Sequence, residues 1–178
     1  MITKTELEFK GDLYPSKIVS FEHDGDSVYL NTDNSVVLKV TIIRDSLIRF
    51  RYTTKGYFSN DFSYAIDKNH AHGYNFLEVT VEDDYYQIQT SKVKCIIQKA
   101  DMRVSIFDIH GTILLEDELG FHWEESYEHG GNIVKMSKAS KDGECFYGLG
   151  DKATQMNLKG KRLENFATDQ YAFQKDQE

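Results

Sequence analysis

The sequence has little of the residues that mark several common classes of protein. It contains one proline and two cysteines in 178 residues, which is too little cysteine for a disulfide framework. No apolar run approaches the roughly 18 residues that a membrane helix needs. The first six residues, Met1–Glu6, have no apolar stretch like that of a signal peptide. These absences predict a cytoplasmic protein with no membrane partner.

Positive charge is also scarce. The chain has 21 basic and 29 acidic residues, which gives a net charge of −8. This balance opposes binding to nucleic acids and to anionic membrane surfaces, because both need lysine and arginine to neutralise phosphates. Hydrophobic residues make up 40% of the sequence and charged residues 28%. A chain of this length and composition can bury a core, and its size suits one domain.

The two cysteines, Cys95 and Cys145, both lie in apolar stretches that resemble strands. A free cysteine in such a setting behaves as a small apolar side chain. The sequence therefore predicts two reduced thiols in the core.

Alternation of apolar and polar residues runs through most of the chain, which is typical of strands with one buried face. Turn residues such as Asp24–Asp26 and Asp142–Gly143 separate the alternating stretches, and His110–Gly111 predicts a two-residue hairpin turn. No segment has a helical period of ten or more residues. The pattern predicts an all-β sandwich or barrel. The alternating stretches are residues 28–31, 38–43, 48–52, 77–81, 86–88, 93–97, 104–106, 112–115, 121–127 and 133–139.

Two groups of residues are candidates for a metal or sugar site. His70 and His72 lie close together in a predicted loop, but a zinc site needs three or four ligands and no third is suggested by spacing. The second group consists of His122, Glu124, Glu125, Glu128 and His129. A polar strand face is the favoured interpretation of this group, and solvated loop histidines that of the first. We therefore predict no metal site.

The least ordinary stretch runs from Glu144 to Lys152 and contains Gly148-Leu149-Gly150. It lacks the later glycine and the lysine of a phosphate-binding loop, and it follows a β-meander rather than opening a helix. Glycines in such a place indicate a bend in the backbone or a close approach of another chain segment. No pair of carboxylates or catalytic triad can be assigned from spacing alone.

Glu144–Lys152, followed by Asn157, Gly160 and Ala167-Thr168-Asp169, resembles the end of the N-terminal domain of glycoside hydrolase family 31. The upstream strands and turns have a similar rhythm. The resemblance implies a β-sandwich, or supersandwich, of the galactose-mutarotase-like kind over residues 1–178. Residues 144–178 would lead toward a catalytic TIM barrel that this sequence does not contain.

The resemblance also implies a function. The parent would be a retaining α-glycosidase, similar to an α-glucosidase, that hydrolyses α-linked oligosaccharides or glycosides. This domain would be non-catalytic, would need no cofactor and would pack on the parent's own TIM barrel. Asp169 matches an aspartate that reaches the sugar in this family, so we predict substrate binding there, although Phe166 and Ala167 depart from the usual residues.

Other functions remain open from the sequence. The chain could be a self-sufficient carbohydrate-binding module or a scaffolding domain. It could also be a mutarotase-like epimerase, whose acid and base would come from a histidine such as His122 and a facing glutamate.

Overall fold

A computed structural model of the chain describes residues 11–61, 78–126, 130–150 and 154–164. The chain forms two compact units, Met1–Ala139 and Ser140–Glu178. The described ranges contain no helix that could cross a membrane. Their strands are β1 (Ile18–Asp24), β2 (Ser27–Thr32), β3 (Val37–Arg44), β4 (Leu47–Thr53), β5 (Glu78–Val81), β6 (Tyr85–Gln89), β7 (Val93–Gln98), β8 (Val104–Asp108), β9 (Ile113–Ser126) and β10 (Gly131–Lys138).

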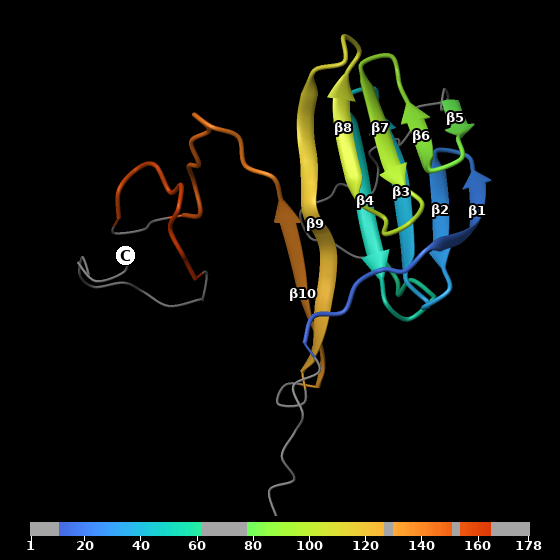
Figure 1. Cartoon of the computed structure of the whole chain (residues 1–178), viewed down its shortest axis with the longest axis horizontal. Coiled ribbons are helices and arrows are strands. Elements are labelled where there is room, and N and C mark those ends of the chain that lie inside the picture. The colour runs from blue at the N-terminus through green and yellow to red at the C-terminus, as the bar shows by residue number, and fades with distance from the viewer. Residues whose placement is uncertain (1–10, 62–77, 127–129, 151–153, 165–178) are drawn as a thin grey trace, which may run out of the picture. The chain divides into compact units, whose positions relative to one another are not determined.

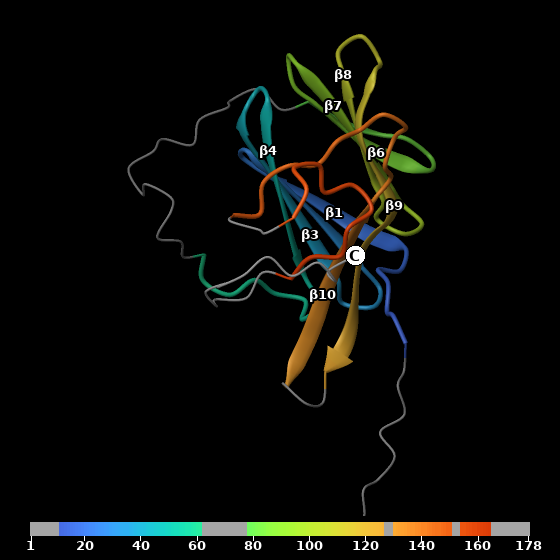
Figure 2. The ribbon, with the colours of Figure 1, turned by 90° about the vertical axis from the view of Figure 1, so that its left-hand side faces the viewer.

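The strands of the first unit form two antiparallel sheets. The four-stranded sheet has the order β1-β2-β3-β4, and the six-stranded sheet has the order β10-β9-β8-β7-β6-β5. One sheet lies behind the other in Figure 1, and the view at 90° in Figure 2 shows the β9–β10 hairpin extending past the end of the sandwich. The predicted all-β sandwich is confirmed.

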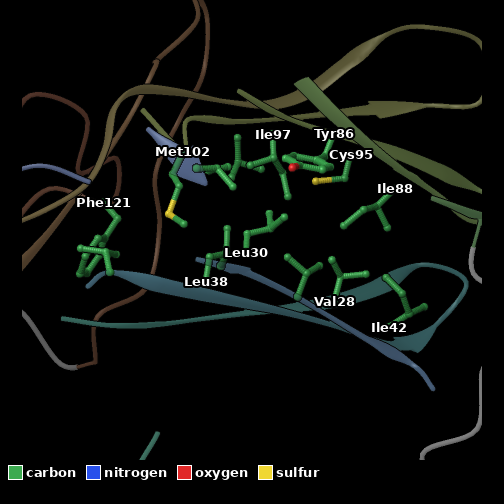
Figure 3. Close-up of a cluster of buried hydrophobic side chains, with 14 of the residues drawn as sticks. Val28, Leu30, Leu38, Ile42, Tyr86, Ile88, Cys95, Ile97, Met102 and Phe121 are labelled. Atoms are coloured by element: carbon green, nitrogen blue, oxygen red, sulfur yellow. The ribbon is translucent and has the colours of Figure 1, made fainter. Parts of the chain in front are cut away.

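The core lies between the facing sides of the two sheets. Val28, Leu30 and Ile42 point inward from the four-stranded sheet, and Ile88 and Ile97 approach them from the six-stranded sheet (Figure 3). All five of these residues are 0% exposed. The alternation along the strands arises because every second side chain enters this core.

The connection between β8 and β9 differs from the predicted two-residue turn. The strands end at Asp108 and resume at Ile113, so the loop is longer than His110–Gly111. The Asp108 carboxylate accepts hydrogen bonds from the backbone N–H groups of His110 and Thr112, both at 2.8 Å. This carboxylate therefore satisfies two backbone donors of the longer loop.

A bulge in β9 buries a charged residue. Between Asp117 and Gly120, β9 has two more residues than the paired part of β10. The side chain of Asp117 is 0% exposed; it accepts hydrogen bonds from Lys138 Nζ and from the backbone N–H of Val104, the latter at 2.8 Å. Gly120 has a φ of +68°, and a Cβ there would lie 2.8 Å from Asp117 Oδ2. The bulge therefore requires glycine at this position.

The two cysteines have different surroundings. Cys95 is buried, as predicted, and burial raises the pKa of its thiol. Cys145 is exposed, so the prediction of a second core thiol is wrong. Its strand-like apolar neighbours belong to an irregular segment that has no sheet to pack in.

This difference predicts unequal thiol reactivity. In the native protein, Ellman's reagent should modify Cys145 rapidly and Cys95 at least about 100-fold more slowly, because the buried thiol reacts only when the core opens. Both should react rapidly in denaturant. The Cys145→Ser variant, which should lose only the rapid phase, is the control; two equally rapid phases in the native protein would contradict the assignment.

Candidate functional site

The predicted substrate-contacting residue, Asp169, lies outside the described residues, so its role stays a prediction. The same holds for His70 and His72, and for Glu128 and His129. Residues 140–150 and 154–164, called here the C-terminal segment, form the described part of the chain that precedes Asp169. They contain no strand, so turns and side-chain hydrogen bonds set their conformation.

The Gly148-Leu149-Gly150 stretch is a sharp backbone bend, in agreement with the structural interpretation of these glycines. All three residues have positive φ angles, of 108°, 64° and 79° respectively. Leu149 adopts a left-handed conformation that is uncommon for a residue with a Cβ atom. Three such residues in succession prevent a strand from continuing past this point.

Asn157 holds the C-terminal segment together. Its Oδ1 accepts hydrogen bonds from the backbone N–H groups of Phe146 and Lys159, both at 3.1 Å, and its Nδ2 donates to Cys145 Sγ at 3.4 Å. The N–H of Leu158 adds a backbone bond to the Phe146 carbonyl at 2.8 Å. The two arms on either side of the bend are thus joined by this amide side chain and by the backbone bond. The sequence showed Asn157 only as part of the family motif.

The polar group around His122 is a strand face whose side chains are already engaged. His122 is 5% exposed, its Nδ1 lies 3.0 Å from the Gly120 carbonyl, and its ring stacks on Tyr14 at 5.3 Å. Glu124 accepts a hydrogen bond from Lys135 at 2.9 Å. A buried, stacked imidazole beside a paired carboxylate does not resemble an acid and base facing a substrate.

The same group offers no metal site in the part of the chain that the structure describes. No three or more His, Cys, Asp and Glu side chains there could hold an ion. Lys135 also donates to Asp12 at 2.6 Å, and its hydrogen bonds to Asp12 and then to Glu124 raise the pKa of its ammonium. The positive charge beside the Asp12 and Glu124 carboxylates is therefore that of Lys135.

A further polar group lies on the outer face of the four-stranded sheet, and the sequence analysis did not single it out. A hollow of about 190 Å³ is lined there by residues from the turn before β2, from β2, β3 and β4, and from the segment after β4. The only signal in the sequence was the run of cationic residues at alternate positions of the strands, which reads equally well as a solvated face. The lining residues are Asp26, Ser27, Lys39, Thr41, Ile43, Arg49, Arg51 and Asp61.

Comparison with known proteins identifies the family. Residues 37–178 match the family described as the glycosyl hydrolase 31 N-terminal galactose mutarotase-like domain. Over 154 residues the chain is 25% identical to Alpha-glucosidase 2 of Bacillus thermoamyloliquefaciens, covering 86% of this chain and 19% of that protein.

Solved structures of glycoside hydrolase family 31 proteins share the fold. A dextranase of Flavobacterium johnsoniae in complex with glucose matches with a TM-score of 0.78 and 22% identity, over 92% of this chain and 20% of that chain. An α-xylosidase of Xanthomonas citri matches with a TM-score of 0.67 and 23% identity, over 78% of this chain and 16% of that chain.

These relatives are much longer than the chain described here, which spans about a fifth of their length. The matched region includes the C-terminal segment and extends to Asp169 and beyond. It also includes β3 to β10, which are all of the six-stranded sheet and two strands of the four-stranded sheet. The chain belongs to glycoside hydrolase family 31, as its N-terminal galactose mutarotase-like domain.

Proposed function

We propose that the chain is a non-catalytic domain of a retaining α-glycosidase, and that it shapes one wall of the parent's substrate pocket. The observation that carries this proposal is the family match, which includes the C-terminal segment and Asp169. The coverage of about a fifth of each relative supports a parent with further domains. The engaged state of His122 supports a domain that supplies no acid or base of its own.

The C-terminal segment is suited to contact another part of the parent. Phe146, Tyr147, Leu149 and Met156 are large apolar side chains that are 47%, 65%, 51% and 86% exposed. Several exposed large apolar side chains within one short segment are typical of surfaces that pack against a partner. We propose that this partner is the parent's TIM barrel and that the bend and Asn157 fix the direction in which the chain continues toward Asp169.

The proposed chemistry needs two carboxylates supplied by the barrel. In a retaining glycosidase one carboxylate attacks the sugar and the other protonates the leaving group and later activates water. The domain's contribution would be binding: the Asp169 carboxylate would accept hydrogen bonds from sugar hydroxyls, which charge strengthens. The substrates would be α-linked glucosides or related glycosides, in keeping with the relatives named as an α-glucosidase, a dextranase and an α-xylosidase.

Activity assays test this proposal. The full-length protein that contains this chain should release sugar from at least one of maltose, isomaltose and an α-xyloside. Proton NMR at early times should show the α anomer of the product first, because two displacements retain the configuration. The chain alone should release none. A β anomer formed first would contradict the retaining mechanism, and hydrolysis by the chain alone would contradict the non-catalytic role.

A further inference from the structure

The outer face of the four-stranded sheet carries a preformed hollow of about 190 Å³. Its floor consists of two rows of side chains that lie side by side across the strands. One row is Ser27, Thr41 and Arg49, and the other contains Lys39 and Arg51, since these residues are paired in the β2–β3 and β3–β4 registers. The rows face away from the core because Val28, Val40 and Phe50, at the intervening positions, pack on its side of the sheet.

The walls of the hollow are fixed by bonds within the chain. The Ser27 hydroxyl donates to Asp26 Oδ1 at 2.8 Å and lies 2.9 Å from the Thr41 hydroxyl. Arg49 forms a two-bond pair with the Asp61 carboxylate, one bond being 3.0 Å long. The hydrogen bond from Arg49 lowers the pKa of Asp61, so this carboxylate is ionised in neutral solution.

The segment after β4 closes one side of the hollow by folding back along that strand. Thr53 Oγ1 donates to the Tyr57 carbonyl at 2.8 Å, and Arg51 donates to the Ser59 carbonyl at the same distance. The Arg49–Asp61 pair is the third such contact: each contact lies two residues further back along β4 and two residues further on along the returning segment. Arg49, Arg51 and Thr53, at alternate positions of β4, therefore each hold a residue of the returning segment, which fixes this wall.

Aromatic rings stand beside the hollow, each in contact with a cation that lines it. Lys39 Nζ lies 5.0 Å from the centre of the Tyr29 ring, and the guanidinium carbon of Arg51 lies 5.0 Å from the centre of the Phe58 ring. The two rings are 6.4 Å apart. These contacts hold the long cationic side chains against the sheet. The side chains therefore lose less conformational entropy when a ligand binds to them.

The chemistry of the lining selects among ligands. The lining contains three cations, two carboxylates, two hydroxyls and one apolar side chain. The two carboxylates oppose a phosphate or another small anion, and the density of charge opposes an apolar ligand. A sugar hydroxyl both donates and accepts, so neighbouring hydroxyls of a pyranose can satisfy a carboxylate and an adjacent cation together. The volume would hold about six water molecules, which is the scale of one sugar ring.

We propose that this hollow is a saccharide-binding site for a neutral pyranose unit, formed by residues other than Asp169 and the C-terminal segment. The inference goes beyond the proposed function, because it concerns the first unit alone and assigns sugar binding to a surface that supplies no catalytic group. Lys39 and the Thr41 hydroxyl are the contacting groups that can be changed without breaking the Arg49–Asp61 pair.

Titration of the ¹⁵N-labelled chain with isomaltotriose or maltotriose, followed by NMR, tests the site. The expected result is saturable shifts at the backbone amides of Lys39, Thr41 and Arg49, with a Kd of about 1–10 mM for a site of this size. The Lys39→Met variant should weaken binding about tenfold through loss of a charged hydrogen bond. The Thr41→Val variant should weaken it several-fold.

Lys94→Met is the matched control. Lys94 also lies over an aromatic ring, with Nζ 5.2 Å from the centre of Phe107, but it is on β7 of the other sheet. This variant should bind as the wild type does. Absence of saturable shifts, shifts confined to the C-terminal segment, or saturation by sodium phosphate instead of sugar would each overturn the proposal. None of these outcomes bears on the hydrolysis assay, so the two proposals fail separately.

Discussion

The Lys138→Met variant should lose about 3 kcal/mol of unfolding free energy, which is a large part of the stability of a domain of this size. Lys138 pairs with Asp117, whose side chain is 0% exposed, while that of Lys138 is 34% exposed. Removing the ammonium leaves a buried carboxylate with the Val104 N–H as its remaining donor. Breaking a fully buried pair costs about 3–5 kcal/mol, and the partial exposure of Lys138 places this case at the lower end. Urea unfolding at neutral pH measures the loss.

Lys135→Met is the control for this prediction, because it makes the same change on the same strand. Lys135 is 33% exposed, but its partners Asp12 and Glu124 are 33% and 19% exposed and remain in contact with water. This variant should lose less than about 1 kcal/mol. Equal losses for Lys135→Met and Lys138→Met would show that burial of Asp117 does not decide the cost.

A double variant separates the charge from the packing. Asp117→Asn removes the carboxylate and keeps an oxygen that can accept the Val104 N–H bond. In the Lys138→Met background this change should restore part of the lost stability, because no buried charge is then left without a partner. Further destabilisation of the double variant, additive with the first change, would contradict an ion-pair role for Lys138.

The strands could be predicted from the sequence because burial of one face imposes a period of two. The alternation of residues 38–42 follows directly from Leu38, Val40 and Ile42 entering the core, each at most 1% exposed. The bulge at Asp117 could not be predicted in the same way. Its burial depends on Lys138, which is 21 residues away in sequence, and on a glycine whose conformation only the paired strand explains.

The features of the candidate sites also differ in whether local sequence could predict them. The bend at Gly148–Gly150 could be inferred locally, since glycine pairs mark such positions. The exposure of Cys145 could not, because apolar neighbours alone do not say whether a sheet is present to cover them. The hollow depends on the contact of Ser27 with Thr41, which the strand register brings together, and on that of Arg49 with Asp61, which the fold-back of the segment after β4 brings together. A sequence pattern does not give that register.

In the full-length protein, Asp169→Ala should lower kcat/KM for the α-linked substrate by about 10- to 150-fold. A hydrogen bond between a charged group and a substrate hydroxyl contributes about 1.5–3 kcal/mol, and about 1.4 kcal/mol corresponds to a factor of ten. If the carboxylate binds ground state and transition state equally, the loss should appear mainly in KM. Steady-state kinetics with the substrate that the full-length protein cleaves best measures both constants.

Two further variants make the Asp169 prediction specific. Asp142→Ala removes an exposed turn carboxylate from the same unit and should leave kcat/KM within about twofold. Asp169→Asn keeps the shape of the side chain and one accepting oxygen, so its activity should fall between those of the wild type and Asp169→Ala. Because the charge is what strengthens the bond, Asp169→Asn with wild-type kinetics would mean that no charged contact exists. Unchanged kinetics for Asp169→Ala would remove this residue from the substrate pocket altogether.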